Sequence, residues 1–383
     1  MEMDHPLSEL HIMSRTRVRI PTGKEPLRLG FVPLSDCAPL VYGWEAGLFA
    51  RHGLEVELRR ETRWSEIRDK IISGDLDAAQ APATLPFITN LGLESDPFAC
   101  VSAMVLSLEG CGIVVSKQLW DEGVEDASSL RELIYRNWRK RTFTFAVSSL
   151  YSPEHLIFRH WLKIAAIIPD VEIRLIVIPP DQLFPTLKLG YIDGFCAGEP
   201  WISVTVAAGI AKCIVSSGEL IPRHPAKVLI VRQSYAAGRS EEHERLIAAL
   251  LESCAFCNNP GNRTLLGEML APADYVNAPT EFIQAGLPGT GLPISTMSEP
   301  ARTSIFSGTD ANEPTDTKAE WVISNLYEVL GRGMASLGIE GRSPVLKNIF
   351  RTDIYARAKA VLCGDPKGGS GIEWKPEHEA LAG

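Results

Sequence analysis

The sequence lacks the long apolar stretch that a membrane-spanning helix needs. A span takes about 18 or more consecutive apolar residues, and the longest apolar runs, such as that from Ile202 to Ile210, are interrupted by Ser, Thr and Gly. Basic residues are also in the minority, since 38 Lys and Arg face 47 Asp and Glu and give a formal net charge of −9. This balance disfavours a nucleic-acid surface. We therefore expect no membrane span and no direct nucleic-acid partner.

An export signal is also missing from the sequence as written. Residues 1–26 contain neither an apolar core nor a small-residue cleavage site. We therefore expect a cytoplasmic protein. A start site further upstream would instead allow a periplasmic or membrane-associated one.

Cysteine is sparse and scattered, with 8 residues that mostly sit inside apolar runs. This distribution is typical of reduced, buried thiols. Cys254 and Cys257 form a single C-x-x-C within a helical pattern, and a zinc ribbon would need a second pair. We expect no metal site.

The common catalytic patterns are absent as well. The chain has no G-x-S-x-G, no Walker A loop, no G-x-G-x-x-G and no H-E-x-x-H. His155 and His160 are five positions apart, so on a helix they diverge and do not readily share a metal. These absences favour a binding protein that uses no cofactor over an enzyme.

Strands alternate with helices along most of the chain. Residues 27–32 read as a buried strand, and Leu54, Val56 and Leu58 alternate with charged residues as in a half-buried strand. Ser152 followed by Pro153 is typical of a helix start. Residues 192–197 and 227–232 read as strands and residues 318–330 as an amphipathic helix. The alternation predicts an α/β protein with parallel sheets, whose ligands bind beyond the carboxyl ends of the strands.

Three polar groups stand at the ends of these predicted elements. Trp64 begins a helix, Lys227 begins a strand, and Gly198 lies in a strand-to-helix turn. Free backbone N–H groups and the helix dipole at such a turn favour an anion. Each signal is weak alone, because a helix-start tryptophan is often a hydrophobic anchor and a single lysine is usually solvated.

Ordered blocks over residues 27–360 resemble the nitrate/bicarbonate solute-binding proteins of ABC importers. The blocks are GFVPLSDCAPL (30–40), WSEIRDK (64–70), GDLDAA (74–79), DGFCAGEPW (193–201), PAKVL (225–229), YVNAP (275–279), DANEP (310–314), KAEW (318–321) and RTDIY (351–355).

The resemblance implies a two-lobed, periplasmic-binding-protein-like fold of type II, with a hinge and a ligand cleft between the lobes. Residues 27–110 and 225–363 would form the first lobe and residues 111–224 the second. Residues 1–26 would be a flexible segment and residues 364–383 a disordered tail.

The resemblance also implies a binding site. In the family, a tryptophan matching Trp64, a backbone amide matching Gly198 and a lysine matching Lys227 contact the anion. An indole N–H, an amide N–H and an ammonium group give a nitrate ion directional donors and one balancing charge. Bicarbonate-type members favour a carboxylate near the lysine position. Lys227 therefore favours nitrate or nitrite.

Two positions depart from the pattern of the nitrate-binding members. Cys111 stands in the segment where they present a glutamine, and Glu154, beside His155, stands where they present a histidine. A thiol is a poor donor, and a carboxylate repels an anion unless it is protonated or paired. Either Glu154 points to solvent and His155 or Ser152 takes its place, or the ligand is not nitrate.

The sequence thus predicts a non-catalytic receptor for nitrate or nitrite. Its partner would be an ABC transporter permease, or an antiterminator protein held by a cytoplasmic nitrate/nitrite sensor. Alternatives are a bicarbonate, sulfonate or other organic-anion binder. Another is an enzyme like those of thiamine-pyrimidine synthesis, which share the fold but use a Cys-rich iron-binding segment that this chain does not reproduce.

Overall fold

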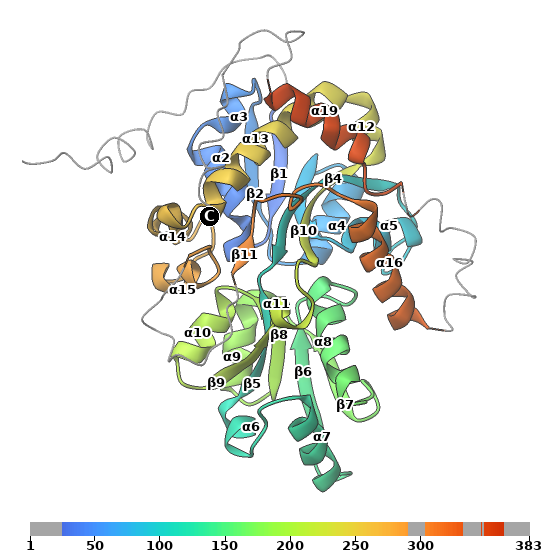
Figure 1. Cartoon of the computed structure of the whole chain (residues 1–383), viewed down its shortest axis with the longest axis vertical. Helices are drawn as coiled ribbons and strands as arrows, with labels where there is room; N and C mark the ends of the chain where they lie inside the picture. Colours follow the sequence, from blue (N-terminus) through green and yellow to red (C-terminus); the bar gives the residue numbers. More distant parts are fainter. Residues whose placement is uncertain (1–24, 290–302, 332–345, 347, 364–383) are drawn as a thin grey trace, which may run out of the picture.

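The chain folds into two α/β lobes that lie one above the other along the long axis of the molecule (Figure 1). The computed structural model describes residues 25–289, 303–331, 346 and 348–363. The first lobe contains a six-stranded sheet in the order β11-β4-β10-β3-β1-β2, and the second a five-stranded sheet in the order β7-β6-β8-β5-β9. The predicted α/β fold is confirmed. The tail expected at residues 364–383 and most of the expected N-terminal segment lie outside the described residues.

The first lobe holds the strands β1 (Leu27–Phe31), β2 (Val56–Arg60), β3 (Ala78–Pro82), β4 (Cys100–Glu109), β10 (Pro225–Arg232) and β11 (Ser304–Ile305). Its helices are α2 (Ala38–Glu45), α3 (Leu48–Arg51), α4 (Trp64–Ser73), α5 (Leu85–Leu91), α12 (Gln233–Gly238), α13 (Ser240–Asn258), α14 (Arg263–Leu270), α15 (Thr280–Ala285), α16 (Asp316–Leu330) and α19 (Thr352–Leu362). The helix expected at 318–330 is thus confirmed as α16.

The second lobe holds the strands β5 (Cys111–Ser116), β6 (Phe143–Val147), β7 (Ile173–Val177), β8 (Gly194–Gly198) and β9 (Ala211–Ser216). Its helices are α6 (Lys117–Asp121), α7 (Ala127–Arg136), α8 (Pro153–Ile164), α9 (Leu183–Lys188), α10 (Trp201–Ala207) and α11 (Ser217–Leu220). Single 3₁₀ turns occur at Ser35–Cys37, Pro180–Gln182 and Pro260–Asn262.

The prediction of parallel sheets is wrong for two strands of the first lobe and one of the second. β10 runs antiparallel to β3 and β4, β11 runs antiparallel to β4, and β5 runs antiparallel to β8 and β9. β10 and β5 enter from the other lobe, at the edge where the carboxyl ends of the parallel strands lie, so they must run the opposite way. Lys227, near the start of β10, therefore pairs with Pro82 at the end of β3.

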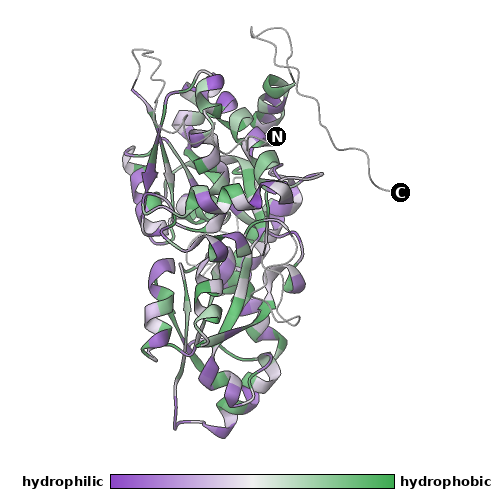
Figure 2. Ribbon diagram, turned by 90° about the vertical axis from the view of Figure 1, so that its left-hand side faces the viewer, coloured by the Kyte–Doolittle hydropathy of each residue, from purple (hydrophilic) through white to green (hydrophobic). Residues whose placement is uncertain are grey.

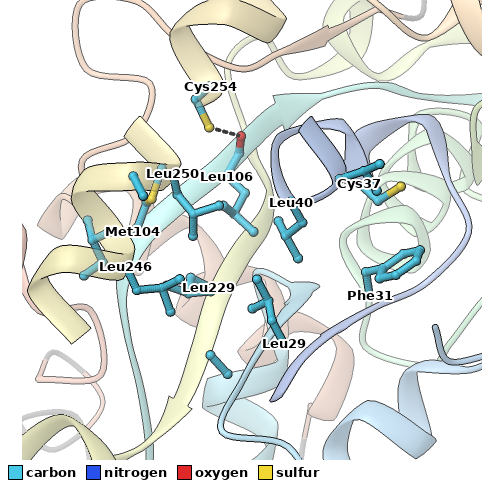
Figure 3. Packing of buried hydrophobic residues seen from close by; sticks show 14 of the residues in the cluster. Leu29, Phe31, Cys37, Leu40, Met104, Leu106, Leu229, Leu246, Leu250 and Cys254 are labelled. Carbon is cyan, nitrogen blue, oxygen red and sulfur yellow. Dashed lines mark hydrogen bonds between the residues drawn. The ribbon is translucent and has the colours of Figure 1, made fainter. Parts of the chain in front are cut away.

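In the core of the first lobe, leucines, other apolar side chains and buried thiols pack against one face of the sheet (Figure 3). Figure 2 shows the hydrophobic strands inside each lobe and more hydrophilic helix faces outside. Cys254, on α13, is fully buried, and its thiol donates to the carbonyl of Leu106 at 3.7 Å. Burial raises the pKa of both Cys254 and Cys257, so neither thiol of the C-x-x-C readily becomes the thiolate that binds metals.

Two chain crossings connect the lobes and are tied together. β4 passes into β5 through Glu109 and Gly110, which have φ angles of 58° and 91°. The second crossing joins α11 to β10. The backbone N–H of Arg223, in this crossing, donates to Glu109 Oε1 at 2.7 Å. The left-handed backbone at Glu109 and Gly110 turns the chain sharply between the sheets.

Helix α8 starts after Ser152, as the sequence predicts, and its first turn lies at the boundary between the lobes. The hydroxyl of Ser152 accepts from the backbone N–H of His155 at 3.2 Å, and Pro153 occupies the first helical position. The cap satisfies one of the free N–H groups at the helix start. It also fixes Glu154 in the first turn of the helix.

Gly194 tests how tightly the second sheet is packed. A Cβ there would lie 2.3 Å from the carbonyl oxygen of Val114 and 2.7 Å from the Phe145 ring. We expect Gly194→Ala to lower the free energy of unfolding by about 1–3 kcal/mol, measured by urea denaturation. Gly238→Ala is the control, because a Cβ there meets no atom within 4 Å. Equal stability of both variants and the natural chain would contradict this packing.

Candidate functional site

Lys227 lies buried between the lobes, with 2% of its surface exposed. Its Nζ donates to Glu154 Oε1 of the second lobe at 2.8 Å and lies 3.2 Å from Asp36 Oδ2 of the first lobe. We call the group of Lys227, Asp36, Glu154, Trp64 and Gln80 the lysine cluster. It lies at the carboxyl edge of the parallel strands, where the sequence predicted a ligand.

Asp36 and Gln80 are members of the lysine cluster that the sequence analysis did not select. Asp36 lies in the turn after β1, and Gln80 lies within β3. The Nε2 of Gln80 donates to Asp36 Oδ1 at 2.6 Å. A signal for Gln80 was available, because a glutamine among alanines in a buried strand calls for a polar partner.

Glu154 faces the site and not the solvent, so the first alternative offered for it in the sequence analysis is wrong. It is 2% exposed and its Oε1 pairs with Lys227. Its Oε2 is buried and has no hydrogen-bond partner among the described residues. Glu154 therefore brings both a charge and an unused acceptor to the cluster.

Trp64 lies where the sequence predicts, at the first position of α4, and it is 1% exposed. The Nζ of Lys227 is 5.5 Å from the centre of a Trp64 ring, a cation–π distance. The indole Nε1–H of Trp64 is buried and has no acceptor within the described part of the chain. Buried donors of this kind are rare unless a ligand or water completes them.

Gly198 and Cys111 lie opposite each other on β8 and β5, at the edge of the second sheet that faces the first lobe. The neighbouring carbonyl of Glu199 accepts from the N–H of Ser35 at 2.8 Å, and Trp201 Nε1 donates to the carbonyl of Pro33 at 3.2 Å. Gly198 therefore lies beside a line of contacts between the lobes. Cys111, at the start of β5, therefore lies at the same edge of the second sheet as Gly198.

His155 is buried beside Glu154 but has a local role. Its Nδ1 accepts from the backbone N–H of Tyr151 at 2.9 Å. Burial, with the charge of Arg159, lowers the pKa of His155 to about 3, so the ring is neutral at physiological pH. Among the described residues no hydrogen bond connects His155 to the lysine cluster. His155 therefore orders the start of α8 and forms no hydrogen bond with Lys227 among the described residues.

The charges in the lysine cluster oppose one another. Burial would lower the pKa of Lys227, but Asp36 and Glu154 raise it, so the ammonium stays charged. Burial opposes ionisation of Glu154, yet Lys227 holds the pKa of this carboxyl below its usual value. Burial raises the pKa of Asp36 despite Lys227 and Gln80. Asp36 is therefore the carboxyl that takes up a proton more readily.

The cluster offers a ligand both kinds of hydrogen-bonding group. Trp64 Nε1 is an unused donor, and Glu154 Oε2 and Gln80 Oε1 are unused acceptors, all buried. Lys227 supplies the charge. Over the described ranges, no group of three or more His, Cys, Asp and Glu side chains is arranged to hold a metal ion. The donor set suits a small polar anion better than a metal.

A comparison with the profiles of known protein families shows which family the chain belongs to. Residues 21–271 match the profile of the NMT1-like family. The chain belongs to the NMT1-like family. The match includes most of the lysine cluster's surroundings, from β1 through β10.

Curated relatives of this NMT1-like chain are components of ABC transporters. It is 37% identical over 305 residues to the bicarbonate transport ATP-binding protein CmpC of Synechococcus elongatus, covering 79% of this chain and 45% of CmpC. It is 38% identical over 262 residues to the nitrate import ATP-binding protein NrtC of Synechocystis, covering 68% of this chain and 39% of NrtC. The chain thus spans less than half the length of these two relatives.

A solved structure supports the fold of this NMT1-like chain. The periplasmic nitrate-binding protein NrtA from Synechocystis superposes with a TM-score of 0.79 at 22% identity, covering 88% of this chain and 89% of NrtA. The two-sheet architecture is therefore that of periplasmic binding proteins, as predicted.

Removing the cation should destabilise the protein. Lys227→Met leaves two buried carboxylates without their counter-charge, so we expect the free energy of unfolding at pH 7 to fall by about 3–5 kcal/mol. Because Lys227 lowers the pKa of Glu154, the ion pair contributes fully above the ordinary glutamate pKa of about 4.3 and less as the pH falls below it. The difference in the free energy of unfolding between the natural chain and Lys227→Met should therefore become smaller below this pH.

Lys117→Met is the matched control for this prediction. Lys117 pairs with Asp121 at 2.6 Å, and the two side chains are 58% and 55% exposed. Its removal should cost about 1 kcal/mol or less. Urea denaturation across acidic and neutral pH measures both variants, and a Lys227→Met variant as stable as Lys117→Met at pH 7 would show that the cluster is not a buried ion pair.

Proposed function

We propose that this chain is a non-catalytic receptor that binds one small oxyanion between its lobes. The observation that carries the proposal is the buried ammonium of Lys227 beside the unpaired indole N–H of Trp64. A dehydrated oxyanion needs directional donors and a positive charge. The relationship to transport components for bicarbonate and nitrate supports the same class of ligand.

The two carboxylates of the lysine cluster favour bicarbonate as the oxyanion. Asp36 and Glu154 already balance the charge of Lys227, so a nitrate ion would add a negative charge beside an acceptor, Glu154 Oε2. Bicarbonate carries a hydroxyl that can donate to this oxygen while its other oxygens accept from Trp64 and Lys227. We therefore infer a ligand that brings its own proton.

Nitrate or nitrite is the second candidate, and Lys227 itself favours it. Binding of nitrate would be accompanied by protonation of Asp36, whose pKa burial already raises. Nitrate affinity would then rise as the pH falls. A sulfonate is a third ligand to titrate, since it has the same need for donors in a roomier pocket.

The binding would serve transport or sensing. Contacts between Ser35 and Glu199 and between Pro33 and Trp201 join the lobes, and a ligand that strengthens this closed arrangement shifts the population towards it. We propose that an ABC transporter permease or a regulatory protein such as an antiterminator reads that shift.

Calorimetric titration with bicarbonate, nitrate, nitrite and an alkanesulfonate tests the function. We expect bicarbonate to bind most tightly. Trp64→Phe keeps an aromatic ring at this position but removes the Nε1–H donor, so bicarbonate affinity should fall about fivefold to tenfold. Lys227→Ala should abolish measurable binding. Glu154→Gln should lower bicarbonate affinity at least about tenfold, because the charged acceptor for the bicarbonate hydroxyl is lost. The same change should raise nitrate affinity, because it removes a negative charge next to the nitrate ion.

Two groups elsewhere in the first lobe, the half-buried Trp44 and the buried Glu61, supply the matched controls. Trp44→Phe removes an indole N–H that donates to the carbonyl of Val56, and Glu61→Gln removes a carboxylate paired with Lys70. Neither should change anion affinity. A natural chain that binds none of the four anions would refute the proposed function. If nitrate binds most tightly of the four anions and Glu154→Gln leaves bicarbonate affinity unchanged, only the choice of bicarbonate is refuted.

A further inference from the structure

The far end of the second lobe carries a group of exposed apolar side chains. Their exposed fractions run from 44% at Trp138 to 71% at Tyr191. Most large apolar side chains of the described residues are buried, so this concentration in one lobe needs an explanation. We call the following residues the distal patch: Tyr135, Trp138, Ile164, Ile168, Val171, Leu189 and Tyr191.

The topology of the second sheet brings the distal patch to one end of the molecule. Its residues lie in or beside the connections that lead into β6, β7 and β8, which are parallel neighbours in the order β7-β6-β8. These connections meet at the amino ends of the strands, whereas the lysine cluster lies at their carboxyl ends. Figure 1 shows α7, which leads into β6, at the tip of the second lobe.

Hydrogen bonds join the three connections into one surface. Arg131 Nη1 on α7 donates to the carbonyl of Ala165 at 2.8 Å, which ties α7 to the connection before β7. Arg141 Nη2 donates to Asp193 Oδ1 at 2.6 Å and ties the connections before β6 and β8. The rings of Tyr135 and Trp138 stack with centroids 6.3 Å apart. The patch is therefore held in place without a partner.

Basic side chains lie beside the apolar ones in the connections before β6 and β8, whereas Asp170 and Glu172 flank Val171 in the connection before β7. Arg136, Arg139 and Lys140 are exposed next to Trp138 in the sequence, and across the described ranges no carboxylate pairs with them. Lys188 is also exposed, directly before Leu189. The whole chain carries a net charge of −9, so this local positive charge is the reverse of the average. It complements a negatively charged surface.

We propose that the distal patch docks the protein onto an anionic lipid surface. Tryptophan, tyrosine and aliphatic side chains at an exposed tip, with Arg and Lys beside Trp138 and Leu189, have the composition of segments that enter the interface of a bilayer. Aliphatic side chains disfavour a nucleic acid, and patch against patch in a second copy would oppose like charges. The described helices include none that is long and apolar enough to cross a bilayer. The docking that we propose is through the patch side chains alone.

Attachment at this end leaves the anion site free. The lysine cluster and the contacts of Ser35 and Trp201 across the lobes lie at the opposite edge of the second sheet. Near the patch, Lys163 pairs with Glu328 on α16 of the first lobe at 2.8 Å, but both side chains are more than half exposed, so this pair is weak. The first lobe can then move about the Glu109–Gly110 crossing while the second lobe rests on the lipid. The docking does not depend on which anion binds.

Sedimentation with vesicles tests the proposal on the full chain. We expect binding to vesicles that contain phosphatidylglycerol, weak binding to pure phosphatidylcholine, and weaker binding at high salt. The double variant Arg139→Glu/Lys140→Glu should lose at least about tenfold in vesicle affinity. Trp138→Ser/Val171→Ser should lose a similar factor, because two inserted apolar side chains are removed.

Lys359→Glu and Val361→Ser on α19 are the matched controls, since both residues are exposed in the first lobe. They should leave vesicle affinity within about twofold, given their distance from the patch. Equal sedimentation with neutral and anionic vesicles would overturn the proposal. So would self-association or nucleic-acid binding that the distal-patch variants alone abolish without any effect on vesicles, because either would assign the patch to a different partner.

Discussion

The arrangement of the two lobes depends on one buried cation shared by a carboxylate from each lobe. Lys227 and Asp36 belong to the first lobe and Glu154 to the second. A charge this deeply buried is tolerated only with partners that balance it. The same ion pair therefore connects the lobes, and under the proposed function it also presents the ammonium to the ligand, so that stability and binding would depend on the same atoms. An oxyanion bound there would share Lys227 with Glu154, so the protonation state of the cluster would be part of its specificity.

The topology explains why these groups meet. A strand that crosses from one lobe enters the other sheet at its cleft edge and runs antiparallel there. β10 thus delivers Lys227 to the end of β3, and β5 delivers Cys111 to the end of β8. The capped start of α8 adds Glu154 from the other side. The far ends of the parallel strands in the second lobe remain free for a separate surface, and the distal patch occupies them.

Much of this could be predicted from local patterns, because strand alternation, the Ser152 cap and the helix start at Trp64 depend on neighbouring residues. The positions of Lys227 and Gly198 at strand ends were predictable for the same reason. The partners of Lys227 were not, since Asp36, Gln80 and Glu154 are separated from it by long stretches of sequence. No local pattern says whether Glu154 faces solvent or a buried lysine. The direction of β5 and β10 was missed because it follows from the crossing between lobes and not from the sequence of either strand.

The central claim is that an oxyanion binds at Lys227 between the lobes. A crystal structure of the protein grown in bicarbonate tests it most directly. Our account predicts a planar ligand in contact with Lys227 Nζ and Trp64 Nε1, with one oxygen directed at Glu154. A ligand bound elsewhere, with Lys227 still held only by Asp36 and Glu154, would contradict it.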